Sequence, residues 1–156
     1  MRRKDREIAG RDGIEAILRE ADACRLGFAA GNEPYIVTLN FGYEWEADLP
    51  RLFFHCAREG RKLDMMRLNP RVCFELDVGH ELETGPAPCD YGMKFASVVG
   101  YGRLRELEDE AERLRAMELL ARHYGWSGTG EFKPGPVSAT CVLALEALEI
   151  AGKRKR

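Results

Sequence analysis

The stretch CRLGFAAGNEPYIVTLNF, residues 24–41, decides the fold of this chain. Residues 24–30 and 35–41 have the alternating, β-branched and aromatic composition of strands, and the glycine, asparagine and proline between them are typical of a turn. In the second run, apolar side chains share one face: Tyr35, Val37, Leu39 and Phe41. Ile36, Thr38 and Asn40 fall on the other face, because successive side chains of a strand alternate. The stretch therefore predicts an antiparallel hairpin with one buried face.

The same patterns continue on both sides of the hairpin. Further strands are predicted at residues 51–56, 71–77, 95–107 and 137–150. Helices are predicted at residues 12–22, 59–68 and from about 109 to 124. Six strands that do not alternate regularly with helices disfavour a doubly wound parallel sheet. They favour a mainly β protein, a six-stranded antiparallel split β-barrel with flanking α-helices.

Caps and glycines refine this prediction. Asp12 with Glu15, and Asp109 with Glu112, have the spacing of helix capping pairs. Residues 78–94 contain several glycines and prolines and are predicted to form a long surface loop. Gly100 and Gly102 interrupt a strand pattern, which is typical of a bend or of a close approach by another segment.

Composition limits the class of protein. The 156 residues, 45% of them hydrophobic, suit a single domain spanning residues 1–156. The 24 basic and 26 acidic side chains nearly cancel, so binding to nucleic acid is not expected, and residues 1–10 and 153–156 are interpreted as charged tails. No apolar run is long enough for a signal peptide or a membrane span. The five cysteines form no CxxC pair, and their odd number favours reduced thiols, so we expect a cytoplasmic protein without membrane contact.

The densest group of reactive residues is FFHCAREGRKLD, residues 53–64. A glycine at a helix start, followed by Arg61 and Lys62, offers backbone N–H groups, the positive end of the helix dipole and two cations. A phosphate group requires such a set of donors. Taken alone, a solvated helix start with surface cations is the more ordinary interpretation of Gly-Arg-Lys.

The order of these elements resembles a known family. The run RKLDMMRLNPR, residues 61–71, is similar to the phosphate-binding segment of the pyridoxamine 5′-phosphate oxidase-like FMN-binding split barrels. The resemblance is closer to the branch named for 5-nitroimidazole antibiotic resistance. Its landmarks resemble residues 24–28, 34–43, 54–57, 97–102 and 152–153. Several landmarks in one order, over residues 5–153, make the resemblance specific.

The resemblance implies a cofactor site and a homodimer. FMN, with FAD as the alternative, would be held by Arg61 and Lys62 at its phosphate. Its ring system would lie along Val37, Thr38, Leu39 and Asn40. His55 and Cys56 would lie beside the ribityl chain and phosphate. Ser97 of the partner chain would reach the flavin. In this family the cofactor sits between subunits, so the resemblance makes dimerisation part of the function.

The implied activity is that of a flavin-dependent oxidoreductase that reduces a small planar acceptor, a nitroimidazole-type compound among them. His55 is the candidate catalytic residue, since a neutral imidazole beside a flavin can supply a proton near pH 7. A phosphate-contacting or packed histidine is the more ordinary interpretation. His80 and His123 suggest no metal site. Two alternatives stay open: a non-catalytic flavin-binding or sensing protein, and a split barrel that holds haem through His55.

Two departures from the family pattern matter. The chain lacks the terminal Arg-Leu-His-Asp-Arg stretch with which the pyridoxamine phosphate oxidases bind substrate, so vitamin B6 oxidation is not expected. Thr38 stands where the nitroimidazole branch usually has proline, so the local flavin edge is expected to differ.

Overall fold

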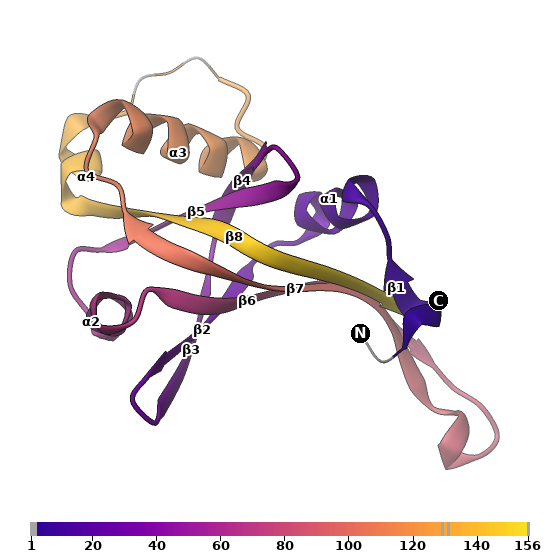
Figure 1. Cartoon of the computed structure of the whole chain (residues 1–156). Coiled ribbons are helices and arrows are strands. Elements are labelled where there is room, and N and C mark those ends of the chain that lie inside the picture. Colours follow the sequence, from indigo (N-terminus) through magenta and orange to yellow (C-terminus); the bar gives the residue numbers. More distant parts are fainter. Residues whose placement is uncertain (1–2, 129, 131, 156) are drawn as a thin grey trace.

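The structure is a computed structural model that describes residues 3–128, 130 and 132–155. Within these residues the chain forms one eight-stranded antiparallel sheet flanked by helices (Figure 1). The strands are β1 (Glu7–Ile8), β2 (Cys24–Ala30), β3 (Glu33–Leu39), β4 (Phe41–Glu46), β5 (Leu49–Ala57), β6 (Arg71–Glu83), β7 (Gly92–Glu106) and β8 (Thr140–Lys155). The helices are α1 (Arg11–Glu20), α2 (Arg61–Leu68), α3 (Glu110–His123) and α4 (Pro134–Ala139), with short 3-10 turns at η1 (Lys4–Arg6) and η2 (Pro88–Asp90).

The strand order explains the split barrel. The sheet runs β3-β2-β6-β7-β8-β5-β4, with β1 added to β8, so β3 and β4 are its two edges. These two edge strands are also consecutive in the chain, because only Asn40 separates Leu39 from Phe41. The sheet must therefore curl until its edges meet at Asn40. The predicted mainly β split-barrel class is confirmed, with eight strands in the described residues instead of six.

The two additional strands are β1 and β4. The predicted strand 35–41 divides at Asn40, and Phe41 begins β4, which pairs with β5 and not with β2. Alternation alone does not reveal this break, because the apolar pattern passes through Asn40 without a change of phase.

The predicted loop at residues 78–94 is largely wrong. β6 continues to Glu83 and β7 begins at Gly92, and the two strands stay paired after an irregularity between Val78 and Glu81. Gly79 adopts a positive φ of 66° at that irregularity, which is why a glycine fits there. Gly85, Pro86 and Pro88 lie in the hairpin tip, and Gly92 begins β7 opposite Glu83.

The predicted tails are also corrected. Residues 4–8 form η1 and β1, and β8 continues to Lys155. Glu7 pairs with Lys153 and Ile8 with Gly152, so both ends of the described chain are held in the sheet.

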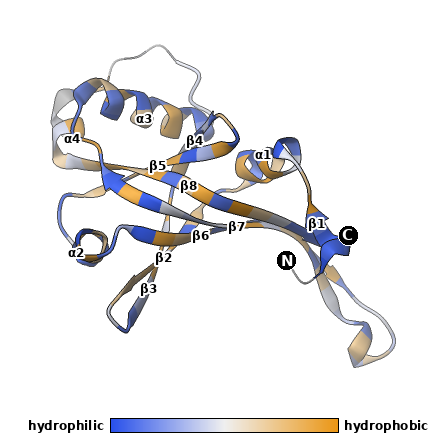
Figure 2. Ribbon diagram, in the orientation of Figure 1, coloured by the Kyte–Doolittle hydropathy of each residue, from blue (hydrophilic) through white to orange (hydrophobic). Residues whose placement is uncertain are grey.

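The hydrophobic core has two parts because β8 is buried on both faces. Cys141, Leu143 and Leu145 face the barrel interior with α1, whereas Val142 and Ala144 face α3. Figure 2 accordingly shows β8 hydrophobic through its middle and hydrophilic at its C-terminal end. None of the helices in the described residues is both long and apolar enough to cross a membrane.

Only one of the two predicted capping pairs is present. Asp109 accepts a hydrogen bond from the Glu112 amide at 2.8 Å and caps α3, as predicted. Asp12 does not cap α1, because that helix begins earlier, with Gly10 at the N-cap and no side-chain cap. Asp12 instead places its charge in the first helical turn, where the helix dipole favours an anion.

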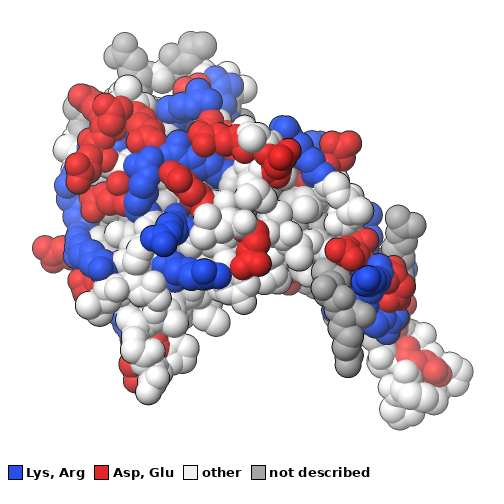
Figure 3. Space-filling model, in the orientation of Figure 1, with Lys and Arg blue, Asp and Glu red and all other residues white. Residues whose placement is uncertain are grey.

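An ion-pair network fastens α3 to the sheet. Arg51, only 11% exposed at its side chain, contacts Glu112 of α3 and Glu146 of β8. Arg105 joins the same two carboxylates, at 2.8 Å from Glu112 and 3.2 Å from Glu146. Figure 3 shows charged side chains of both signs gathered over α3 and the neighbouring strands. Several charges that share partners are worth more than isolated surface pairs.

Candidate functional site

The N-terminus of α2 is a basic helix end. Gly60 is the N-cap, with φ 134°, and no side chain caps the helix there. Arg61 and Lys62 are therefore the first two helical residues, where the dipole is positive. Leu63, Met65 and Met66 are buried and anchor the helix on the core. These features provide the donor set that the sequence predicted for a phosphate.

The two cations reach in different directions. The Arg61 guanidinium lies 4.8 Å from the Tyr35 ring centroid and 3.5 Å from the Glu33 carboxylate, both in β3. Lys62 is half-buried and lies near the end of β5, which stops at Ala57, five residues before it. The basic helix end thus stands between β3 and β5.

The strand predicted to line the flavin ring is the free edge of the sheet. β3 pairs with β2 on one side only, so its other side presents main-chain N–H and C=O groups. Val37 and Leu39 turn toward the core, whereas Thr38 is exposed and lies opposite Arg25 of β2. Asn40 is exposed at the point where the two sheet edges meet.

No pattern in the sequence indicated the residues that hold the chain at the end of this edge strand. The Tyr124 hydroxyl accepts a hydrogen bond from the Phe41 amide at 3.1 Å and donates one to the Asp22 carbonyl at 2.7 Å. The His123 ring lies 4.4 Å from the Phe41 ring and contacts the Ala21 carbonyl at 2.8 Å. The end of α3 therefore holds the chain immediately after Asn40. Its partners are far away in sequence, so local patterns could not reveal it.

His55 and Cys56 lie at the end of β5. His55 is exposed and pairs with Val142, whereas Cys56 is half-buried and pairs with Cys141. A short connection, residues 58–60, joins the end of β5 to Arg61 and Lys62 at the start of α2. The structure thus brings the predicted ribityl-phosphate residues to the same end of the sheet as α2.

Ser97 lies elsewhere. It is half-buried in β7, where it pairs with Asp77 and Lys153. On β8, Lys153 lies twelve residues from Cys141, the partner of Cys56. At a rise of about 3.3 Å per residue, that is about 40 Å along the strand. Figure 1 shows β8 crossing the whole molecule, so a single chain keeps Ser97 away from Cys56 and α2. Across β6 and β2, by contrast, Ser97 lies three strand spacings, about 14 Å, from the register position of Asn40.

An apolar row crosses the outer face of the sheet. Ile36 pairs with Gly27, Gly27 with Cys73, and Cys73 with Tyr101, on four adjacent strands. Ile36 is 70% exposed and Tyr101 42% exposed, although both are large and apolar. Val99, 41% exposed, lies on the same face of β7. Exposed apolar side chains on one face of a sheet form a candidate interaction surface.

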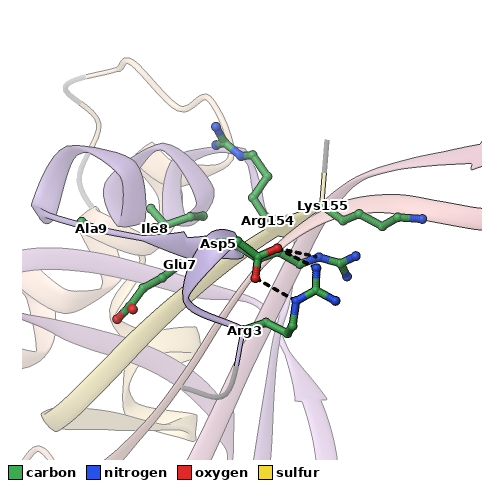
Figure 4. A pocket seen from close by; sticks show the side chains of 8 residues that line it. Arg3, Asp5, Glu7, Ile8, Ala9, Arg154 and Lys155 are labelled. Atoms are coloured by element: carbon green, nitrogen blue, oxygen red, sulfur yellow. Dashed lines mark hydrogen bonds and ion pairs between the residues drawn. The ribbon is translucent and has the colours of Figure 1, made fainter.

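Two hollows lie away from these residues. The one in Figure 4 has a volume of about 610 Å³ and is formed by η1, β1 and the end of β8. Its Arg3 and Arg6 contact Asp5, so part of its positive charge is cancelled. The second, about 830 Å³, lies between α3 and the segment around Trp126. Neither contains a residue predicted to bind flavin, and no group of three metal-ligating side chains is found in the described part of the chain.

Comparisons with known proteins agree with this fold. The sequence profile of the pyridoxamine 5′-phosphate oxidase family matches residues 10–154. A Bacteroides thetaiotaomicron protein, described as a candidate 5-nitroimidazole antibiotic resistance protein, is 30% identical with a TM-score of 0.81, covering 95% of this chain and 86% of its own. An FAD-binding protein of Mesorhizobium loti is 25% identical with a TM-score of 0.69, covering 97% and 98%. An uncharacterized protein of Rhizobium meliloti (strain 1021) is 26% identical, over 94% of this chain and 93% of its own.

Proposed function

Because the chain belongs to the pyridoxamine 5′-phosphate oxidase family, we propose that it binds a flavin nucleotide and uses it for oxidoreduction. The observation that carries the proposal is the position of the uncapped, basic end of α2 between the edge strand β3 and the end of β5. A flavin nucleotide has an anionic tail and a ring with a polar edge. The helix end can bind the anionic tail, and the free main-chain groups of Val37–Asn40 can hydrogen bond to the polar edge of the ring.

FMN is the proposed cofactor. The cations at the helix end, Arg61 and Lys62, are sufficient for one terminal phosphate. Their existing contacts do not prevent binding, because the Arg61–Glu33 pair is exposed on both sides and is worth little. The Mesorhizobium loti relative binds FAD, so FAD is the alternative cofactor. Either cofactor would make this chain a flavin-binding protein.

We propose that the complete site needs two copies of the chain. Ser97 lies at the other end of β8 from Cys56, far from a flavin phosphate bound at α2 of its own chain. The apolar row from Ile36 to Tyr101 offers a surface on which a second copy can pack. A homodimer would then bring the partner's Ser97 to the flavin.

The proposed reaction is the reduction of a small planar acceptor. The flavin, when bound, supplies hydride or electron transfer. In this chain His55 is exposed at the end of β5 and is free to deliver a proton to the acceptor, which is the role proposed for it. The similarity to the Bacteroides thetaiotaomicron protein supports a nitroimidazole as the first acceptor to test.

Cofactor binding is tested with Lys62→Ala. Loss of one charge-assisted contact costs about 1.5–3 kcal/mol, so the dissociation constant for FMN should rise about 10- to 150-fold. Arg67→Ala is the matched control, because Arg67 lies in the last turn of the same helix and should leave the affinity unchanged. The identity of the bound flavin is read by mass spectrometry, and iron analysis separates the haem alternative. Correctly folded protein that takes up no flavin would refute the proposal.

The two-chain site is tested by mixing inactive variants. In a heterodimer of a Lys62→Ala chain and a Ser97→Ala chain, one of the two sites would combine intact Lys62 with intact Ser97. Tight flavin binding should therefore return at half the wild-type stoichiometry. If both residues acted within one chain, both sites would stay defective and no recovery would be seen. A strictly monomeric protein in analytical ultracentrifugation would also contradict the proposal.

Turnover is tested with the flavin-loaded protein. Oxidation of NADH or NADPH that depends on an added nitroimidazole supports the reaction, and His55→Ala should lower its rate without lowering flavin content. If neither nicotinamide is oxidised and the reduced flavin transfers nothing to the acceptor, the non-catalytic flavin-binding alternative stands.

A further inference from the structure

Two cysteines face each other across the junction of β5 and β8. Cys56 and Cys141 are direct partners in the antiparallel register, one pair before the last pairing of Ala57 with Thr140. Directly opposite residues on antiparallel strands have Cα atoms about 4.5 or 5.5 Å apart. Both values lie within the range of about 4.4–6.8 Å that a disulfide requires. The backbone therefore already has the spacing of a cross-strand disulfide.

The two thiols also interact in the structure, in which all five cysteines are free. Their side chains are direct cross-strand neighbours, with Cys141 in the core cluster and Cys56 packed against it. This contact lowers the pKa of Cys56 to about 7; burial opposes the shift, and the charge of Lys62 adds to it. The same contact and burial raise the pKa of Cys141, and the negative charge of Glu106 adds to that rise. Cys56 is thus the thiol that ionises first.

The two sulfurs also differ in solvent exposure, and the thiol with the lower pKa is the more exposed one. Cys141 is 1% exposed, whereas Cys56 is only partly buried. A reactive cysteine needs both thiolate character and access, and a resolving cysteine needs only proximity. Cys56 fits the first role and Cys141 the second.

We propose that Cys56 and Cys141 form a reversible disulfide, a modification site on the strand end that leads into α2. With a peroxide as oxidant, the Cys56 thiolate attacks one peroxide oxygen, and the O–O bond breaks to give a sulfenic acid and hydroxide. The Cys141 sulfur then attacks Cys56, the S–O bond breaks, and water leaves. Two thiols lose two electrons and two protons, and hydrogen peroxide becomes two molecules of water. Glu106 of β7 pairs with Leu143, two residues from Cys141 on β8, and would accept the proton of Cys141.

The other cysteines do not have this arrangement. Cys24 is buried in β2 and pairs with Leu39, and Cys73 pairs with Gly27 and Tyr101. Cys89 is exposed in the hairpin tip between β6 and β7. The site does not depend on the proposed flavin, since it rests only on strands β5 and β8.

The experiment treats the purified full-length protein with hydrogen peroxide and counts thiols after denaturation. The titre should fall from five to three and return to five with dithiothreitol. Tryptic mapping identifies the bond without ambiguity, because Cys56 and Cys141 fall in separate peptides, 52–58 and 123–153, that hold no other cysteine. The linked peptide should appear only before reduction.

Variants separate the two roles. In Cys141→Ala, oxidation by peroxide should stop at a sulfenic acid on Cys56, which dimedone traps. The same variant should also shift the pH midpoint of Cys56 alkylation upward from about pH 7. Cys89→Ser is the control and should still form the disulfide. A titre that stays at five under peroxide, or a bond that joins other cysteines, would overturn the proposal. Circular dichroism of Cys141→Ala checks its fold. If that variant does not fold, the thiol count and peptide mapping of the wild-type protein still test the proposal.

Discussion

The contact between α3 and β4 provides a quantitative test of the fold around the candidate site. Gly42 of β4 lies directly under α3, and a Cβ atom added there would stand 2.5 Å from the Leu120 amide nitrogen and 2.6 Å from the Leu119 carbonyl carbon. These are backbone atoms, which cannot turn aside. To restore ordinary contact at 3.4 Å, Gly42→Ala must push the helix away by roughly 1 Å.

The helix is not free to retreat. Asp109 caps its start, and Tyr124 fastens its end to the chain beside Asn40. Overpacking of a tight site costs about 1–3 kcal/mol, and a rigid backbone obstacle places Gly42→Ala near the upper end. For a chain of this length, about 3 kcal/mol lowers the melting temperature by about 6–12 °C. The displaced helix end should also weaken flavin binding at the sheet edge.

Differential scanning calorimetry of Gly42→Ala measures the shift, with Gly135→Ala as the control. A Cβ at Gly135 of α4 would meet nothing within 4 Å, and this residue lies outside the proposed site and outside the apolar row. A glycine replaced by alanine without strain gains about 0.4–1 kcal/mol, so this control should melt slightly higher than the wild type. Equal melting temperatures for Gly42→Ala and the wild type would refute the packing of α3 on β4.

Two further predictions concern the attachment of α3. Tyr124→Phe leaves the amide of the buried Phe41 without its partner, so the urea midpoint should fall by the equivalent of about 1–3 kcal/mol at unchanged m-value; an unchanged midpoint would show that the hydroxyl does not hold this edge. Hydrogen bonds from Arg105 and Arg51 lower the pKa of Glu112, so its contribution to stability is present above pH 4.5 and is lost as the pH falls through the lower folded pKa. Glu112→Gln should therefore be less stable than the wild type at neutral pH and lose less stability on acidification, and parallel acid-unfolding curves would contradict this.

The sequence predicted the basic helix start well. Gly60, Arg61 and Lys62 are adjacent in the chain, so their arrangement follows from local helix geometry alone. The strand pattern of residues 24–41 likewise predicted the β2–β3 hairpin, because alternation and turn residues act over short distances. The extent of β6 and β7 was missed, since pairing within a long hairpin tolerated a glycine at the irregularity near Val78.

By itself, the sequence determined the mainly β class, the basic start of α2 and most of the strand β3, since each depends on neighbours a few positions apart. Only the tertiary structure decided what surrounds them. Tyr124 meets Phe41, and Cys56 meets Cys141, across more than 80 residues of chain, and Ser97 is separated from Cys56 by the length of β8. Such relations depend on strand order and register, which are set by how the whole sheet curls to bury its two apolar cores.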